Sequence, residues 1–113
     1  MASYLVANYN VTNEAGYNQY LASVGPTIMN HGGKILVAGP GSTPVEGNPG
    51  AITVVLEFPT REALEGWYNS PEYQEIIHLR TDNSEGGLIF ADEFQPPGYV
   101  SYTHLTLPTT PYV

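Results

Sequence analysis

Arg80 is the side chain in this sequence best placed to do chemistry. It follows Tyr73 and Ile77 by seven and three residues, so in a helix the three share one face, which we expect to point inward. A guanidinium on that face suits a ligand carboxylate, because it can donate two parallel hydrogen bonds to it. The structural alternatives are a cation that bonds the last carbonyls of its helix, or an ion pair with Glu57 or Asp82.

His31 and Glu57 are the candidates for proton transfer. A histidine titrates near neutral pH and can act as a general base, so His31 joins Arg80 as a candidate catalytic residue. The structural alternative for His31 is a helix-end cation or a polar residue that fills the turn. Glu57 ends a strand and would be a base or a ligand contact only if it were desolvated. A salt bridge from Glu57 to Arg80 or Arg61 is the alternative.

Tyr17, Trp67 and Tyr73 are candidates to contact a ligand together with Glu57. Each of the three rings lies on an apolar helix face, where an aromatic side chain packs in a core or forms a pocket wall. The two tyrosine hydroxyls could also orient a bound molecule. A pocket with these walls and few cations fits a small hydrophobic or aromatic molecule, with or without one acidic group.

Composition excludes several classes of function. The 113 residues contain three strong cations against eleven carboxylates, a net charge of −8, which makes nucleic acid and anionic membranes poor partners. The chain has no cysteine. No spacing of histidines and carboxylates suggests a metal site, and no nucleophile motif such as GxSxG is present. We therefore expect neither a metal nor another cofactor.

The start of the chain and its apolar runs bear on its location. The segment MASYLVANYNV has no basic stretch followed by a long apolar run, so it does not resemble a signal peptide. No apolar run approaches the ~18 residues of a membrane-spanning helix. The simplest expectation is a cytoplasmic protein.

The candidate residues must be positioned by strands and helices that the hydropathy pattern predicts. Alternating apolar residues predict four strands, at residues 3–11, 34–38, 51–58 and 88–94. In the first strand Leu5, Ala7, Tyr9 and Val11 share a face. Between strands lie a Gly/Pro-rich connection at 39–50, for which a short pairing around 44–46 is an alternative to a continuous loop, and a polar turn at 82–87.

Two helices separate these strands. Thr12 or Asn13 caps the first helix, which has a kink or a fresh turn at residues 25–26 and ends at the glycines after His31. Thr60 caps the second helix. Ser70, followed by a proline and a glutamate, restarts it as a second half.

The order β-α-β-β-α-β predicts an α+β, ferredoxin-like fold with a four-stranded antiparallel sheet and both helices on one face. The uncovered face would carry Val6, Val55, Ile89 and Ala91, which is too apolar to remain in water. We therefore expect a homodimer in which the two sheets face each other, a dimeric α/β barrel.

Composition changes abruptly after residue 94, so we expect one domain at 1–94 and a separate tail at 95–113. The tail contains no Lys, Arg or carboxylate and four of the ten prolines. Such a segment is typical of a disordered or loosely docked extension. Its sequence SYTHLTLPTTPYV also resembles translated sequencing-adapter read-through, which would make the tail an artefact.

The segments YLVANYNVTN, HGGK and VVLEFPTREALEGWYNSPEYQEIIHLR resemble the domain-of-unknown-function 1330 family, over about residues 4–94. That family belongs to the dimeric α/β-barrel superfamily. The resemblance implies a ferredoxin-like subunit, a dimer, and a pocket between sheet and helices. Superfamily members include cofactor-free aromatic monooxygenases, haem-degrading monooxygenases, lactone isomerases and stress-response proteins.

Two functions follow from this reading. The first is a small-molecule-binding protein that acts, without a cofactor, on an aromatic or lactone-like compound in a monooxygenase or isomerase type of reaction. The alternative is a non-catalytic dimeric carrier or stress-response protein that binds such a molecule unchanged. Fold analogy indicates where the site lies and leaves the reaction open.

The haem-degrading members of that superfamily share a three-residue pattern. They use an asparagine on the first strand with a tryptophan and a histidine on the second helix, which Asn8, Trp67 and His78 resemble. However, His78 follows Trp67 by eleven residues instead of ten, which turns its side chain by about 100° around the helix. We expect His78 in solvent and Asn8 on the mixed face of the sheet, so haem chemistry is not favoured.

Overall fold

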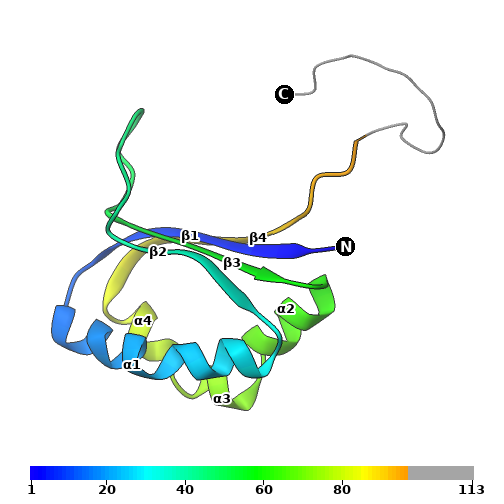
Figure 1. Cartoon of the computed structure of the whole chain (residues 1–113). Coiled ribbons are helices and arrows are strands. Elements are labelled where there is room, and N and C mark those ends of the chain that lie inside the picture. The colour runs from blue at the N-terminus through cyan, green and yellow to red at the C-terminus, as the bar shows by residue number, and fades with distance from the viewer. Residues whose placement is uncertain (97–113) are drawn as a thin grey trace.

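The computed structural model describes residues 1–96, and these form one layer of helices beneath one antiparallel sheet (Figure 1). The sheet has the strand order β2-β3-β1-β4, with neighbouring strands antiparallel throughout. Its strands are β1 (Ser3–Val11), β2 (Lys34–Gly39), β3 (Ile52–Phe58) and β4 (Ser84–Asp92). The helices are α1 (Glu14–Asn30), α2 (Arg61–Tyr68), α3 (Pro71–Gln74) and α4 (Ile77–Thr81). The ferredoxin-like fold class predicted from the sequence is confirmed.

The core lies between the sheet and the helices. Alternate residues of β1 point into it, as the sequence predicted, with Leu5, Ala7 and Tyr9 buried. Leu56 and Phe58 of β3 lie beside them. From the helices come the other buried hydrophobic side chains: Tyr17, Tyr20, Ile28, Leu64, Trp67 and Tyr73.

Helix α1 begins and ends as predicted but is not interrupted. The side chain of Asn13 accepts a hydrogen bond from the backbone N–H of Gly16, and Gly32 takes a φ of 78° after the last turn. Between them the helix runs through Pro26 to Asn30. Of the two alternatives predicted here, the fresh turn is wrong, because proline removes a single backbone hydrogen bond and buried residues such as Ile28 hold the next turn in place, while the kink stays a prediction.

The segment between β3 and β4 follows its predicted capping residues and adds a second break. Thr60 accepts from Ala63 N–H at 3.0 Å and Ser70 accepts from Tyr73 N–H at 3.2 Å, which start α2 and α3. A turn at residues 75–76 then separates α3 from α4, where a single half-helix was expected. Arg80 still faces inward from α4 and is buried.

Strand β4 begins four residues earlier than predicted, and the expected polar turn at 82–87 shrinks to 82–83. Gly86 and Gly87 pair with Tyr9 and Asn8 of β1. A Cβ at Gly86 would lie 2.5 Å from the Tyr9 Cα, so this approach requires glycine. The run Ser-Glu-Gly-Gly reads as a turn by composition, yet β1 supplies its partners. Within the described residues, 40–51 contain no strand, so the short pairing considered around 44–46 is absent.

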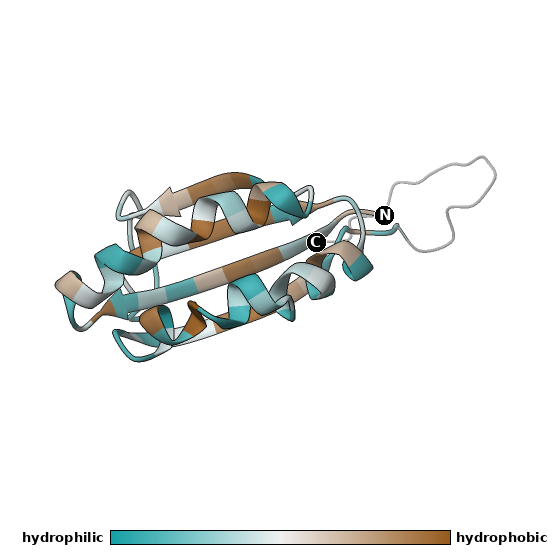
Figure 2. Cartoon of the chain, turned by 90° about the horizontal axis from the view of Figure 1, so that it is seen from below, coloured by the Kyte–Doolittle hydropathy of each residue, from teal (hydrophilic) through white to brown (hydrophobic). Residues whose placement is uncertain are grey.

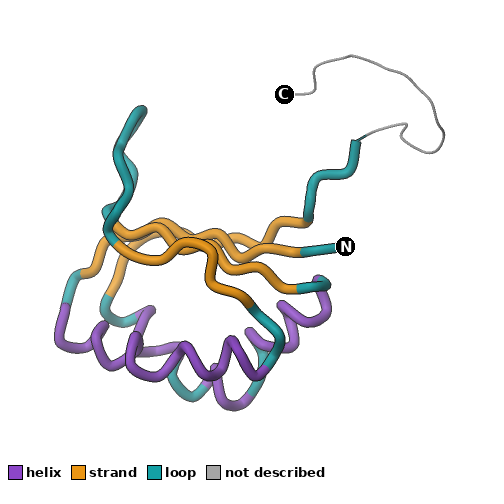
Figure 3. The backbone as a smooth tube through the Cα atoms, viewed as in Figure 1, coloured by secondary structure: helices purple, strands orange, loops and turns teal. Residues whose placement is uncertain are grey.

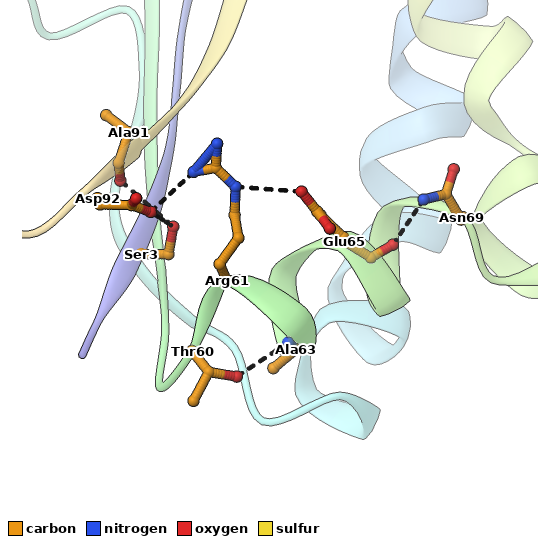
Figure 4. Close-up of polar contacts among 8 residues, drawn as sticks. All are labelled: Ser3, Thr60, Arg61, Ala63, Glu65, Asn69, Ala91 and Asp92. Atoms are coloured by element: carbon orange, nitrogen blue, oxygen red, sulfur yellow. Dashed lines mark hydrogen bonds and ion pairs between the residues drawn. The ribbon is translucent and has the colours of Figure 1, made fainter.

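A polar cluster fixes the start of α2 to the sheet (Figure 4). Arg61 donates to Asp92 at 2.7 Å and to Glu65, one turn ahead, at 3.2 Å. Ser3 of β1 also donates to Asp92, at 2.8 Å. The Ser3 hydroxyl and the Arg61 guanidinium together lower the pKa of the Asp92 carboxyl. Arg61 therefore serves a structural contact between α2, β1 and β4.

Most of the separate tail expected at 95–113 lies outside the described residues, so its disorder or artefactual origin stays a prediction. In residues 1–96, no helix has both the length and the apolar character needed to cross a membrane.

Two glycine-to-alanine variants test the packing, because they should change the free energy of unfolding in opposite directions. A Cβ at Gly33 would lie 2.6 Å from side-chain atoms of Ile28 and of the fully buried Phe58, so Gly33→Ala should destabilise by about 1–3 kcal/mol. Gly66 lies inside α2 with nothing within 4 Å of an added Cβ, so Gly66→Ala should stabilise by about 0.5–1 kcal/mol. Urea unfolding measures both. A Gly33→Ala protein as stable as the parent would contradict the packed turn between α1 and β2.

Candidate functional site

A cavity of about 300 Å³ lies between the inner face of the sheet and the helices. Its walls are mostly aliphatic and aromatic: Ala7 and Val54 line it from the sheet, Val24 from α1 and Trp67 from α2. Figure 2 looks onto the helix side of the molecule, where α1 and the α2–α4 segment lie on either side of the sheet's centre. The single strong cation in the lining is Arg80.

Four tyrosines bring hydroxyl groups to this region in two pairs. Tyr9 of β1 and Tyr17 of α1 share a hydrogen bond of 2.7 Å between their hydroxyls. Tyr20, one turn after Tyr17, shares one of 2.8 Å with Tyr73 of α3. Burial, together with the neighbouring tyrosines, raises the pKa of Tyr9 and of Tyr20 well above the ordinary value. These two hydroxyls therefore remain protonated at physiological pH.

Arg80 is 9% exposed and has no carboxylate within 4.0 Å among residues 1–96. Its hydrogen bond runs from Nε to the Tyr73 hydroxyl, at 3.4 Å. Burial lowers the pKa of Arg80, but the nearby tyrosine hydroxyls outweigh this and leave it raised. The guanidinium is therefore a permanent cation at the cavity. The structural roles considered for it, an ion pair or contacts to the last helix carbonyls, are not found in the described residues.

Glu57 lies on the opposite face of the sheet. Its carboxylate accepts from the Tyr4 hydroxyl at 2.9 Å and lies 3.9 Å from the Lys34 ammonium. The salt bridge expected from Glu57 to Arg80 or Arg61 is therefore wrong. Strand alternation explains this, because Glu57 follows Leu56, which faces the cavity. The structure does not bring Glu57 to the other candidate residues.

His31 closes helix α1 away from the cavity lining. Its Nδ1 donates to the carbonyl oxygen of Thr27 at 3.0 Å, and its Nε2 lies 3.8 Å from the Glu72 carboxylate of α3. These contacts fit the polar, turn-filling role that was weighed against catalysis. His31 and Arg80, the two candidate catalytic residues, do not share a site in this structure.

Tyr17, Trp67 and Tyr73 do gather around the cavity. Tyr17 and Trp67 line it directly. Trp67 is 1% exposed, and its indole N–H donates to the Thr27 hydroxyl at 3.0 Å. Tyr73 is fully buried behind Trp67, with ring centroids 4.1 Å apart. Tyr17 and Trp67, two of the aromatic residues that the sequence suggested as ligand contacts, therefore form part of the cavity wall.

Asn8, Trp67 and His78, which resemble the residues of a haem-degrading site, do not come together in the structure. Asn8 faces away from the cavity, where its amide bonds both the N–H and the carbonyl of Gly50. His78 is exposed, as expected. Within residues 1–96, no three His, Asp or Glu side chains cluster closely enough to hold a metal ion.

The sequence predicted an apolar strand face for Tyr9, but the polar role of Tyr9 and Tyr20 was missed. The available signal was that buried tyrosine hydroxyls need hydrogen-bond partners. Tyr17 and Tyr20 were also one turn apart on the same helix face. Their partners, Tyr9 and Tyr73, come from other elements and depend on how those elements pack. The pairing could not be read from local spacing.

Comparisons with known proteins address the family and the fold. The model of the family described as domain of unknown function (DUF1330) matches residues 2–94. No curated protein matches the chain.

Several solved structures share the fold at low sequence identity. A protein of unknown function from Rhodopseudomonas palustris is 17% identical with a TM-score of 0.65, covering 84% of each chain. SnoaB, a cofactor-independent oxygenase from Streptomyces nogalater, is 10% identical with a TM-score of 0.61, covering 86% of this chain and 97% of its own. A dimeric protein of unknown function and ferredoxin-like fold from Bacteroides fragilis is 13% identical with a TM-score of 0.54, covering 81% and 96%. These likenesses establish the fold alone.

The raised pKa of Tyr20 gives a pH dependence with a defined sign. The protonated hydroxyl of Tyr20 contributes its full stabilisation of the fold below about pH 10, the pKa of a tyrosine in the unfolded chain. This contribution is lost as the pH rises above that value. Tyr20→Phe should cost about 1 kcal/mol at pH 8 through the lost hydrogen bond to Tyr73. It should also lose less stability than the parent between pH 10 and 11. Urea unfolding across this range measures the effect, and equal pH slopes for the two proteins would contradict it.

Proposed function

The chain belongs to the DUF1330 family, and we propose that it binds a small, largely apolar or aromatic molecule in the cavity between its sheet and helices. The observation that carries this proposal is the cavity of about 300 Å³ with mainly apolar walls and few polar groups. Ligand sites have this composition, because apolar contact supplies affinity and a few polar groups set orientation. Trp67 and Tyr17 provide aromatic surface for a planar ligand.

The same cavity supports a second candidate, a cofactor-independent reaction on such a compound. The observation that favours it is a permanent cation, Arg80, beside the buried, hydrogen-bonded hydroxyls of Tyr73 and Tyr20. Groups of this kind stabilise negative charge that develops on a substrate oxygen. The fold shared with an oxygenase that needs no cofactor agrees with this candidate. Because His31 lies away from the lining, Arg80 is the residue that would stabilise this negative charge. A bound compound recovered unchanged after long incubation, with and without oxygen, would identify a carrier.

We also propose that the chain forms a homodimer, and the uncovered face of the sheet supports this. Val37, Val55, Val6 and Ile89 lie next to one another across all four strands, forming an apolar row. The helices cover only the other face (Figure 1). Residues 40–51 form a long loop that rises on the uncovered side (Figure 3). A second copy placed sheet to sheet would cover the row and lie beside this loop, and the Bacteroides fragilis protein of similar fold is dimeric.

Filling the cavity tests the binding proposal. Val54 lines the cavity from the sheet's interior, so Val54→Phe should place a ring in the ligand's space. N-phenyl-1-naphthylamine, a neutral aromatic dye, should fluoresce on binding the parent and quench the emission of buried Trp67. We expect Val54→Phe to weaken that binding about tenfold or more, an affinity loss of about 1.4 kcal/mol.

Val45→Phe is the matched control, because Val45 is 86% exposed in the loop and the change in side chain is the same. The control should bind the dye like the parent. Equal binding by both variants would place the dye elsewhere, and failure of the parent to bind it or other apolar aromatics would contradict the proposal.

A charge on the uncovered sheet face tests the dimer. Ile89 is 59% exposed in the subunit, so Ile89→Lys should fold normally and disrupt the pairing of two sheets. Light scattering at micromolar concentration should give twice the chain mass for the parent and the single-chain mass for the variant. Met29→Lys is the control, since Met29 is 64% exposed on the helix side. A parent of single-chain mass would contradict the dimer.

A further inference from the structure

A second, smaller cavity of about 160 Å³ lies on the other side of Arg80. Tyr9, Arg80 and Leu88 line both this cavity and the large one, so they form the partition between them. The remaining lining of the small cavity comes from the end of α4 and the start of β4: Thr81, Ser84, Gly86 and Gly87. The large cavity is mainly apolar, whereas the small one is bounded by hydroxyl-bearing residues and glycines.

Arg80 differs from the other cations of the described chain in its lack of an acidic partner. Lys34 is exposed and Arg61 is half-buried, and each has a carboxylate within reach, at 3.9 and 2.7 Å. Arg80 is the buried one, and no carboxylate of residues 1–96 lies within 4.0 Å of it. Buried charges in proteins are almost always paired, because removing an ion from water is costly unless an opposite charge replaces the solvent. The sequence contains eleven acidic side chains that could form such an ion pair, and none of those in residues 1–96 does so with Arg80.

The geometry points to a ligand that supplies the missing charge. We infer that the natural ligand is an amphipathic monoanion, an apolar or aromatic carboxylic acid. Its apolar body fills the large cavity, and its carboxylate accepts from the Arg80 guanidinium, which lines that cavity as well as the small one. This inference rests on the proposed function of the large cavity.

The charge of the two linings sets the class of the anion. Arg80 is the single strong cation lining either cavity, and neither lining contains an acidic residue. One guanidinium neutralises one carboxylate and matches its two oxygens. A doubly charged phosphate would leave one negative charge without a partner in a buried site. The Tyr73 hydroxyl, which accepts from Nε, leaves the terminal nitrogens of the fork for the ligand.

Two probes of equal shape test the inference on the intact protein: 2-naphthoate and its neutral analogue 2-naphthamide. Calorimetric titration should show the acid binding about tenfold or more tighter than the amide, a difference of about 1.4 kcal/mol. Arg80→Met should abolish this preference and leave the affinity for the amide within about twofold of the parent. Arg61→Met, at a cation outside both cavities, should keep the preference.

The stability of the empty Arg80→Met protein provides a second readout. Replacing an unpaired buried charge by an apolar side chain of similar length is expected to keep or raise the melting temperature. A clear fall in melting temperature would identify Arg80 as a structural cation and overturn the inference.

The outcomes separate this inference from the function on which it rests. Equal affinity of the parent for acid and amide overturns the anionic ligand class and leaves the apolar cavity as a binding site. Failure of the parent to bind either probe contradicts the proposed function itself. The comparison of acid with amide needs no variant, so it decides the matter even if Arg80→Met does not fold.

Discussion

The space between the two helical walls depends on two buried hydrogen bonds that cross it. One joins the hydroxyls of Tyr20 on α1 and Tyr73 on α3, and the other joins the Trp67 indole on α2 to the Thr27 hydroxyl on α1. Buried polar groups of this kind must be satisfied, so they fix how α1 lies against the α2–α4 segment. The large rings that carry these groups keep the walls apart. A cavity remains above them, against the sheet.

The same arrangement determines where the cation lies. Tyr73 bonds Tyr20 on one side and Arg80 on the other, so the contact that joins the helices also orients the guanidinium. Arg80 therefore stands at the junction of an apolar and a more polar cavity without a carboxylate from the described chain. A buried cation that lacks a carboxylate partner and is oriented by a neutral hydroxyl is characteristic of a site that awaits an anionic ligand.

Much of this architecture could be predicted from sequence because it depends on local rules. Thr60 and Ser70 are capping residues at the expected positions, and the spacing of Tyr73 and Arg80 places both inward even though the turn at 75–76 breaks the helix. The uncovered apolar face also follows from strand alternation. What failed was set by tertiary contacts. Residues 84–87 look like a turn until β1 pairs with them, and the partner of Glu57 depends on which face of the sheet it occupies.

The central claim is that the cavity holds a ligand whose acidic group pairs with Arg80. A crystal structure of the full chain grown with 2-naphthoate tests it most directly, because it shows both the ring and the surroundings of the guanidinium. We predict the ring against Trp67 and Tyr17, and the carboxylate within hydrogen-bonding distance of Arg80. A protein carboxylate seated on Arg80, from the same chain or a second copy, with the large cavity empty, would contradict the account.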